Sequence, residues 1–121
     1  MSQKSKAENS KPVFKYNHPA GFTKDVIFVV DTYNSNGNLY MGLVEAHTGE
    51  PFTDVTRNFG EPLGENTANI KNTNENEGMA QFLIENELGF IMGNFTEEYP
   101  LFFFDPFKLE EVDPGNQYGK K

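Results

Sequence analysis

The feature that most constrains the fold is an alternation of side chains over residues 39–59. Leucine or methionine occupies every second position at its start, and an alternation resumes after a central Thr-Gly pair. A period of two is typical of β-strands, and Gly49 can supply the positive φ that a tight turn needs. We therefore predict a β-hairpin over Leu39–Phe59, with its turn at Ala46–Glu50.

An earlier segment is suited to pair with this hairpin. Residues Asp25–Tyr33 form the most apolar run in the first half of the chain and are rich in β-branched side chains, which favour a strand. Asn36-Gly37 follows, and Asn-Gly is a preferred pair for the turn of a hairpin. We predict a three-stranded antiparallel meander over 26–59, with Val13–Tyr16 as a short edge strand.

The second half of the chain carries the signals of a helix. Asn74 is followed three positions later by Glu77, which is a capping-box spacing, and Gly89 offers a stop. These signals predict a helix over Glu75–Leu88 that packs on the sheet. The side chains expected to face the sheet are Met79, Phe82, Leu83, Ile84 and Leu88.

Further elements are expected on either side of this helix. Residues Thr67–Asn72 predict a short fourth strand, and the aromatic segment Tyr99–Phe104 predicts a strand that rejoins the sheet. Asp105 precedes a proline, and proline is favoured at the first position of a helix. We predict a last short helix over Pro106–Val112, with Phe107 and Val112 facing inward.

Together these elements predict an α+β fold. It has an antiparallel sheet of four to five strands, one packed helix and a short C-terminal helix. The 121 residues correspond to one domain, which we expect at 12–113. Residues 1–11 are polar and aperiodic and predict a disordered tail, and residues 114–121 predict a loose C-terminal tail.

The charge of the chain is unevenly distributed. The net charge is −8, but residues 25–113 hold three basic residues against seventeen carboxylates, a difference of −14. Residues 1–24 hold five lysines and one glutamate, a difference of +4. An acidic body repels nucleic acid and attracts a basic protein surface, although acidic surfaces also serve general solubility.

The sequence contains no pattern of catalytic or metal-binding residues. It has no cysteine, which excludes a thiolate metal site and fits a reducing cytosol. His18 and His47 are its only histidines, whereas a zinc site needs three or four converging ligands. Nucleophile, phosphate-loop and membrane-span signatures are absent from the sequence. We expect no enzymatic activity, no catalytic residue, no metal or cofactor, no direct binding of nucleic acid or membrane, and a cytoplasmic location.

Several short motifs occur in an order that is similar to that of a known protein family. They are Asn36-Gly37-Asn38-Leu39, Gly49-Glu50-Pro51-Phe52, Thr56-Arg57-Asn58-Phe59, Ala68-Asn69-Ile70-Lys71-Asn72-Thr73-Asn74, Phe82-Leu83-Ile84-Glu85-Asn86-Glu87-Leu88-Gly89 and Tyr99-Pro100-Leu101-Phe102-Phe103-Phe104 followed by Lys108-Leu109-Glu110-Glu111. In this order they resemble an uncharacterised family of small acidic proteins from Firmicutes, often encoded on plasmids, conjugative elements and phages. The family has no assigned catalytic residues. Arg57 departs from it, because that position is usually apolar there, as does Gly93–Glu98, which is acidic where the family is Gly-rich. The resemblance implies a cytosolic α+β accessory protein of a mobile element.

We expect the protein to act by non-enzymatic binding. The first hypothesis is an acidic inhibitor that imitates DNA phosphates and binds a basic protein, such as a bacterial defence nuclease or another nucleic-acid-processing enzyme. The carboxylates expected to form its partner-binding face are Glu61, Glu65, Glu75, Glu77, Glu97 and Glu98. The second hypothesis is a structural or regulatory accessory protein that acts through an aromatic surface, as a monomer or homodimer. An exposed aromatic patch near Phe102–Phe104 would favour the second.

Overall fold

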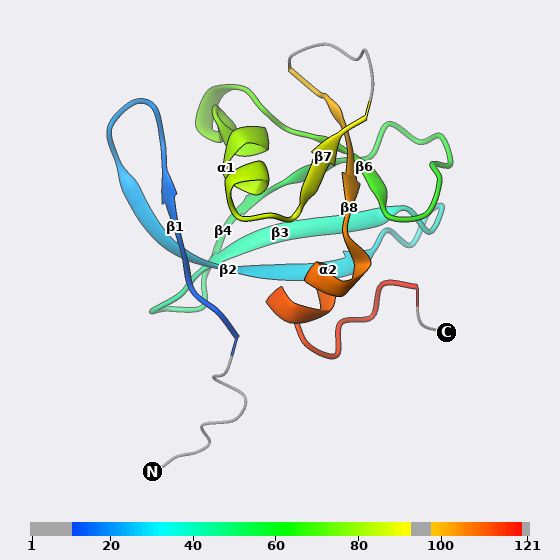
Figure 1. Cartoon of the computed structure of the whole chain (residues 1–121), viewed down its shortest axis with the longest axis horizontal. Coiled ribbons are helices and arrows are strands. Elements are labelled where there is room, and N and C mark those ends of the chain that lie inside the picture. Colours follow the sequence, from blue (N-terminus) through cyan, green and yellow to red (C-terminus); the bar gives the residue numbers. More distant parts are fainter. Residues whose placement is uncertain (1–10, 93–97, 120–121) are drawn as a thin grey trace.

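The computed structural model describes residues 11–92 and 98–119 and contains two four-stranded antiparallel sheets and two short α-helices (Figure 1). The overall class is α+β, as predicted, but the predicted single sheet of four to five strands is wrong. In chain order the elements are β1 (Phe14–Asn17), β2 (Thr23–Thr32), β3 (Leu39–Glu45), β4 (Pro51–Asp54), β5 (Thr56–Arg57), β6 (Thr67–Ile70), the 3₁₀ turn η2 (Asn74–Asn76), α1 (Met79–Glu85), β7 (Gly89–Ile91), β8 (Leu101–Phe104) and α2 (Pro106–Val112).

The first sheet has the order β1-β2-β3-β4. It confirms the predicted meander as far as Asp54, the edge strand and the hairpin turn between β3 and β4. Strands β2 and β3 pair from Val26 opposite Glu45 to Thr32 opposite Leu39. Along β2, every second side chain from Val26 to Val30 is buried, so one face of this sheet supplies the core.

The hairpin's return strand divides at Val55, which explains why the single-sheet prediction failed. The amide of Val55 donates to the carbonyl of Met41 in the first sheet, and its carbonyl accepts from the amide of Lys71 after β6. Thr56 then pairs opposite Ile70 in the second sheet. A strand that passes between two sheets keeps its period of two, so the alternation in the sequence conceals the crossing.

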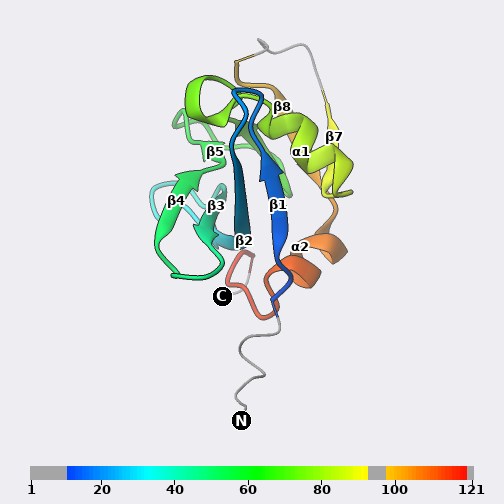
Figure 2. The same ribbon diagram turned by 90° about the vertical axis from the view of Figure 1, so that its left-hand side faces the viewer.

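The second sheet has the order β5-β6-β8-β7. The aromatic strand is confirmed as β8, with Phe102 and Phe104 fully buried, and β6 confirms the short fourth strand. In Figure 1, β7 and β8 run across the direction of β2 and β3. One hydrophobic core combines side chains from both sheets and both helices, and Figure 2 shows the two helices on one side of β2.

The helix predicted over Glu75–Leu88 is replaced by η2, a left-handed Gly78 with φ of 84°, and the shorter α1. The predicted Asn74 cap is wrong, because Asn74 itself has a φ of 57°. Tertiary contacts fix this turn: the buried Asn76 accepts from the hydroxyl of Thr53 and donates to the carbonyl of Asp54. Side-chain bonds of this kind compete with helix formation.

The core face of α1 follows the prediction in large part. Met79, Phe82, Leu83 and Leu88 are buried, whereas Ile84 is exposed. The predicted stop at Gly89 is wrong, because α1 ends at Glu85 and Gly89 begins β7. A Cβ at Gly89 would overlap the carbonyl oxygen of Phe103, so glycine is needed there for close packing of two strands.

Helix α2 has the predicted bounds and cap. The Asp105 carboxylate accepts a hydrogen bond from the amide of Phe107 at 2.9 Å, as expected of an N-cap residue. Leu109 and Val112 are buried, but the inward orientation predicted for Phe107 is wrong, because its side chain is 85% exposed. Phe107 precedes Leu109 by two positions, or about 200° around a helix.

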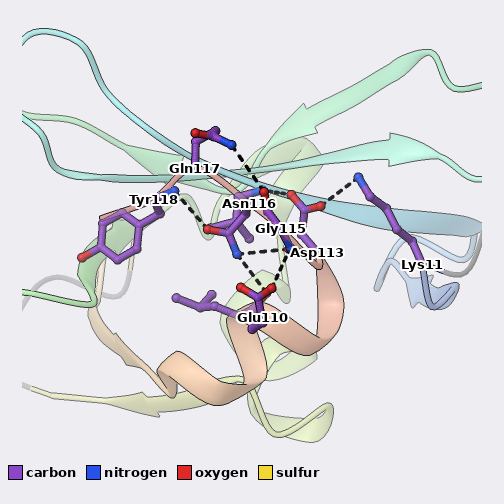
Figure 3. A network of polar contacts seen from close by, with 9 residues as sticks. Lys11, Glu110, Asp113, Gly115, Asn116, Gln117 and Tyr118 are labelled. Carbon is purple, nitrogen blue, oxygen red and sulfur yellow. Dashed lines mark hydrogen bonds and ion pairs between the residues drawn. The ribbon is translucent and has the colours of Figure 1, made fainter. Parts of the chain in front are cut away.

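A polar network holds the end of the chain against β2 (Figure 3). The amide of Val30 donates to the buried carboxylate of Asp113, which also pairs with Lys11 at 2.8 Å. Because β1 pairs with β2 only as far as Val26, Asp113 takes the place of a neighbouring strand. Asn116 is buried and Tyr118 accepts from the amide of Asn66. Within the predicted loose tail at 114–121, Asn116 and Tyr118 thus make hydrogen bonds to the domain. Residues 1–10 of the predicted disordered tail and residues 120–121 lie outside the described residues.

Candidate functional site

The six carboxylates predicted to form an acidic face are placed on different parts of the molecule. Five are exposed, and Glu97 lies outside the described residues. Glu61 and Glu65 precede β6, Glu75 and Glu77 lie in or next to η2, and Glu98 precedes β8. In Figure 1, the loop before β6 lies at the right and the η2 turn at the upper left.

The hollows of the surface show which of these carboxylates come together. Glu77 and Glu98 line one hollow of about 360 Å³ beside Gly78. Glu75 lines a second hollow on the first sheet, and Glu65 lines a third, beside α2. The structure thus joins one pair of the predicted residues and separates the others.

Other carboxylates form local pairs. Hydrogen bonds from His47 and from Lys15 hold the pKa of the Asp25 carboxyl below its usual value, with His47 Nε2 at 3.0 Å and Lys15 Nζ at 2.9 Å. A hydrogen bond from Lys24 likewise lowers the pKa of Glu45. These pairs lie at the end of the first sheet, where the lysines of the N-terminal region meet the acidic body.

The outer face of the second sheet has a different character. The strand pairings place Arg57, Asn69 and Leu101 in one row, and Met92 extends this row because its amide donates to the carbonyl of Leu101. A second row runs from Thr67 through Phe103 to Phe90. Side chains alternate across a sheet, so both rows point away from the buried Phe102 and Phe104. Neither row contains a carboxylate.

We call Phe90, Met92, Leu101 and Phe103 the apolar face. Phe90 is 57% exposed and Met92 is 49% exposed, and the rings of Phe90 and Phe103 lie 5.3 Å apart. Ile91, between Phe90 and Met92 on the edge strand β7, is also exposed, but it pairs opposite Phe102 and therefore points to the other face of the sheet. An apolar edge strand that lacks a charge is a surface on which another chain can pair or pack.

Arg57 extends the apolar face at its β5 end. Its guanidinium lies 4.8 Å from the ring centroid of Phe59 and 5.6 Å from that of Tyr99, and these two rings meet edge to face. Among the described residues, Arg57 makes no ion pair. Stacking on aromatic rings orders an arginine without using its hydrogen-bond donors.

The hollow lined by Glu75 lies on the outer face of the first sheet, above Gly42. The hydroxyl of Tyr40 reaches over Gly42, where a Cβ would overlap it, and donates to Asp54 at 2.8 Å. Burial, and then the hydrogen bond to Asp54, raise the pKa of Tyr40 above its usual value. The hollow measures about 360 Å³.

The family comparison covers both of these surfaces. Residues 27–117 match the family model described as "Domain of unknown function (DUF4313)". The chain belongs to this family. The match runs from within β2 to the segment after α2. The DUF4313 region therefore leaves out β1 and the start of β2 but includes the second sheet, the apolar face and the hollow above Gly42. The chain has no match among curated proteins or solved structures.

Sequence reasoning missed most residues of the apolar face in this DUF4313 protein. It named Phe102–Phe104 as the place to look, and Phe103 does lie on the face, but β7 was not predicted as a strand. A usable signal was the uncharged segment 88–93 between two acidic stretches. The hollow includes Gly42, where the lack of a Cβ makes room for the Tyr40 hydroxyl. This contact is not visible in the sequence.

The described residues contain no group of three or more His, Cys, Asp or Glu side chains that could hold a metal ion. His18 is buried, and its Nδ1 accepts from the amide of Ala20 while its Nε2 lies 3.0 Å from the carbonyl of Asn74. The histidine therefore ties the β1–β2 turn to η2. Within the same residues, no helix has the length and apolarity to cross a membrane.

Proposed function

We propose that this DUF4313 protein is a non-enzymatic binding protein that engages a protein partner through the apolar face. One observation carries the proposal. In a chain with 18 acidic residues, the two outer rows of the second sheet hold the exposed Phe90 and Met92, the half-buried Leu101 and Phe103, and no carboxylate. The role is that of a structural or regulatory accessory protein. A face without carboxylates also suits a homodimer, because two copies can meet there without opposing carboxylates.

The size of the surface supports this proposal. A phenylalanine side chain presents about 150–250 Å², so Phe90 at 57% exposure leaves roughly 100 Å² in water. Met92 and the half-buried Leu101 and Phe103 extend this patch toward the few hundred Å² that mark interaction sites. Burial of Phe90 alone would contribute about 2–3 kcal/mol.

Arg57 adds specificity to the same surface. Arginine and aromatic residues are enriched among the residues that dominate binding energy, and here they are already stacked. In a partner that carries an acidic group beside an apolar segment, the acidic group would pair with the guanidinium of Arg57 and the apolar segment would cover Phe103. The resemblance to mobile-element proteins suggests a bacterial cytosolic partner, and the lack of cysteine is compatible with that compartment.

The test compares two variants that each replace exposed apolar side chains. Phe90→Ser with Met92→Ser removes the centre of the apolar face, and Phe107→Ser removes a more exposed ring on α2. A partner captured by the wild-type protein from host lysate, then purified, should lose at least tenfold in affinity for the double variant and keep its affinity for the control. Equal affinity for the double variant, with an unchanged melting curve, would refute the proposal.

A second candidate function rests on a separate observation. The described members of the predicted acidic face, Glu61, Glu65, Glu75, Glu77 and Glu98, are exposed and make no ion pair with another described residue. They are thus available to a basic protein, as the DNA-mimic hypothesis requires. Its partner would be a defence nuclease or another nucleic-acid-processing enzyme.

Salt distinguishes the second candidate from the first. Exposed charges are screened over about 8 Å at physiological ionic strength, so binding through carboxylates should weaken steeply as salt rises. Replacing Glu75, Glu77, Glu97 and Glu98 together by lysine should abolish this binding and leave the fold intact. Binding that persists in about 0.5 M salt and survives the four replacements would contradict the DNA-mimic function.

A further inference from the structure

The hollow above Gly42 belongs to neither the apolar face nor a single acidic patch. Val29, Gly42 and Asp54 lie opposite one another in three adjacent strands of the first sheet. Because Gly42 has no side chain, the Tyr40 ring can lie across the middle of this row, and the hollow lies beside it. Its volume of about 360 Å³ falls within the range of ligand sites in proteins.

The lining of the hollow is divided between apolar and charged groups. Val29, Val44 and Pro51 contribute apolar surface, whereas Asp54 and Glu75 contribute carboxylates. Asp54 is fixed by the hydrogen bond from Tyr40. A slot with apolar walls and carboxylates at one side matches a side chain that has an aliphatic stem and a cationic head.

Lys71 of the same chain shows where such a head would lie. Its ammonium nitrogen is 3.9 Å from Asp54 Oδ2, which is the length of a weak ion pair, and it also lines the hollow. An exposed pair of this kind contributes little to stability, so an incoming cation can displace it. A guanidinium can bind a carboxylate through two parallel hydrogen bonds, which an ammonium cannot do.

We propose that the hollow above Gly42 receives an arginine side chain of a protein partner. The stem packs against Val29, Val44 and Pro51, and the guanidinium pairs with Asp54 and Glu75 in place of Lys71. Charge complementarity selects this occupant, because the surrounding body carries a large excess of carboxylates and raises the local concentration of cations. The site lies on the other sheet from the apolar face, so it does not depend on the proposed function.

The test is an NMR titration of the full-length protein with Nα-acetyl-arginine methylamide. The neutral probe Nα-acetyl-citrulline methylamide has a similar shape and serves as the reference. We expect the arginine probe to shift the backbone amides of Gly42, Val44 and Asp54, with millimolar affinity and at least a fivefold advantage over citrulline. Equal shifts with both probes, or shifts centred on other carboxylates, would overturn the proposal.

Three variants make the test specific. Asp54→Asn should weaken binding of the arginine probe by about two- to fivefold, the effect of one exposed ion pair, and Lys71→Gln should strengthen it by a similar factor because it removes the competing cation. Glu61→Gln makes the same charge change as Asp54→Asn at a distant loop and should alter the affinity by much less.

The comparison of Asp54→Asn with Glu61→Gln separates local contact from general charge, because the two variants change the net charge equally. If Glu61→Gln weakened binding as much as Asp54→Asn, the probe would be responding only to net charge, and the proposal would fail. It would also fail if Lys71→Gln left the affinity unchanged. Because Lys71 is partly exposed and outside the core, this arm remains decisive even if Asp54→Asn loses its fold.

Discussion

Phe82 joins the second half of the chain to the first sheet, and its removal gives the most direct measure of the packing. The side chain lies on α1 and is 6% exposed. Its ring centroid is 5.1 Å from that of Tyr16 and 5.8 Å from that of Phe28, so one ring contacts both β1 and β2. Loss of this ring removes contacts that no neighbouring side chain can replace.

The expected cost of Phe82→Ala follows from these contacts. Replacement of a buried phenylalanine by alanine costs about 3–5 kcal/mol, which includes the cavity that remains. Each aromatic pair adds about 0.5–1.5 kcal/mol beyond the buried area, and two such pairs are lost. We therefore expect a value in the upper half of the range, near 4–5 kcal/mol.

The assay is equilibrium unfolding in urea, followed by far-ultraviolet circular dichroism. The matched control is Phe107→Ala, which removes the same ring from a position that is 85% exposed and should change the free energy of unfolding by less than about 0.5 kcal/mol. A cost below about 1 kcal/mol for Phe82→Ala would refute the reasoning, because removal of a buried ring should destabilise the protein. Equal costs at Phe82 and Phe107 would refute it as well.

Three further predictions concern single positions. Gly89→Ala should destabilise the protein by more than about 1 kcal/mol in urea, because its Cβ would overlap the carbonyl oxygen of Phe103; a neutral effect would contradict the close approach of β7 and β8. Asp105→Ala should cost about 0.5–2 kcal/mol through loss of the α2 cap, whereas Asp105→Asn should retain most of the stability. Burial, and then repulsion from Glu77, raise the pKa of Tyr16 to about 12, so the stability that its neutral form contributes is fully present below the unfolded-state pKa of about 10. That stability should be lost as pH rises from about 10 to 12, and melting temperatures of Tyr16→Phe should fall less over this interval than those of the wild type.

Local signals in the sequence were sufficient to predict most of the strands and helix α2. The alternation around Gly49 and the Asp105 cap both arise from contacts between residues that are near one another in the sequence. Such contacts produce patterns that can be recognised in the sequence alone. The bounds of α2 and the turn between β3 and β4 were accordingly predicted correctly. The buried face of α1 was also largely predictable, because a helical period does not depend on where the helix begins.

The error in Phe107 is one of helix phase, but the larger errors in the fold share one physical cause, which is a bond to a distant residue. Val55 joins the two sheets through Met41 and Lys71, and no local pattern reveals that junction. Asn76 is bound by Thr53 and Asp54, so the η2 turn replaces the first part of the predicted helix. The position of Asp113 against Val30 likewise spans most of the chain.

The candidate surfaces were less predictable than the fold, because a surface combines residues from several strands. The sequence showed many carboxylates but not that η2 and the loop before β6 would separate Glu75 from Glu61. It showed an aromatic strand but not which of Phe102 and Phe103 would face outward. That choice depends on the register of β8 with β6 and β7, and a shift of one residue would reverse it.

The two proposed surfaces differ in charge, so salt distinguishes which of them binds a partner. Arg57 and the apolar face lie on the second sheet, whereas Asp54 and Glu75 line a hollow on the first. Apolar burial is little affected by moderate salt, but an exposed arginine–carboxylate contact is screened. A complex held mainly by the apolar face should therefore persist as salt rises, and its sensitivity to Asp54→Asn should decrease. A complex held by the hollow should weaken with salt and remain insensitive to Phe90→Ser, so the pairing of salt with these two substitutions identifies the surface that binds.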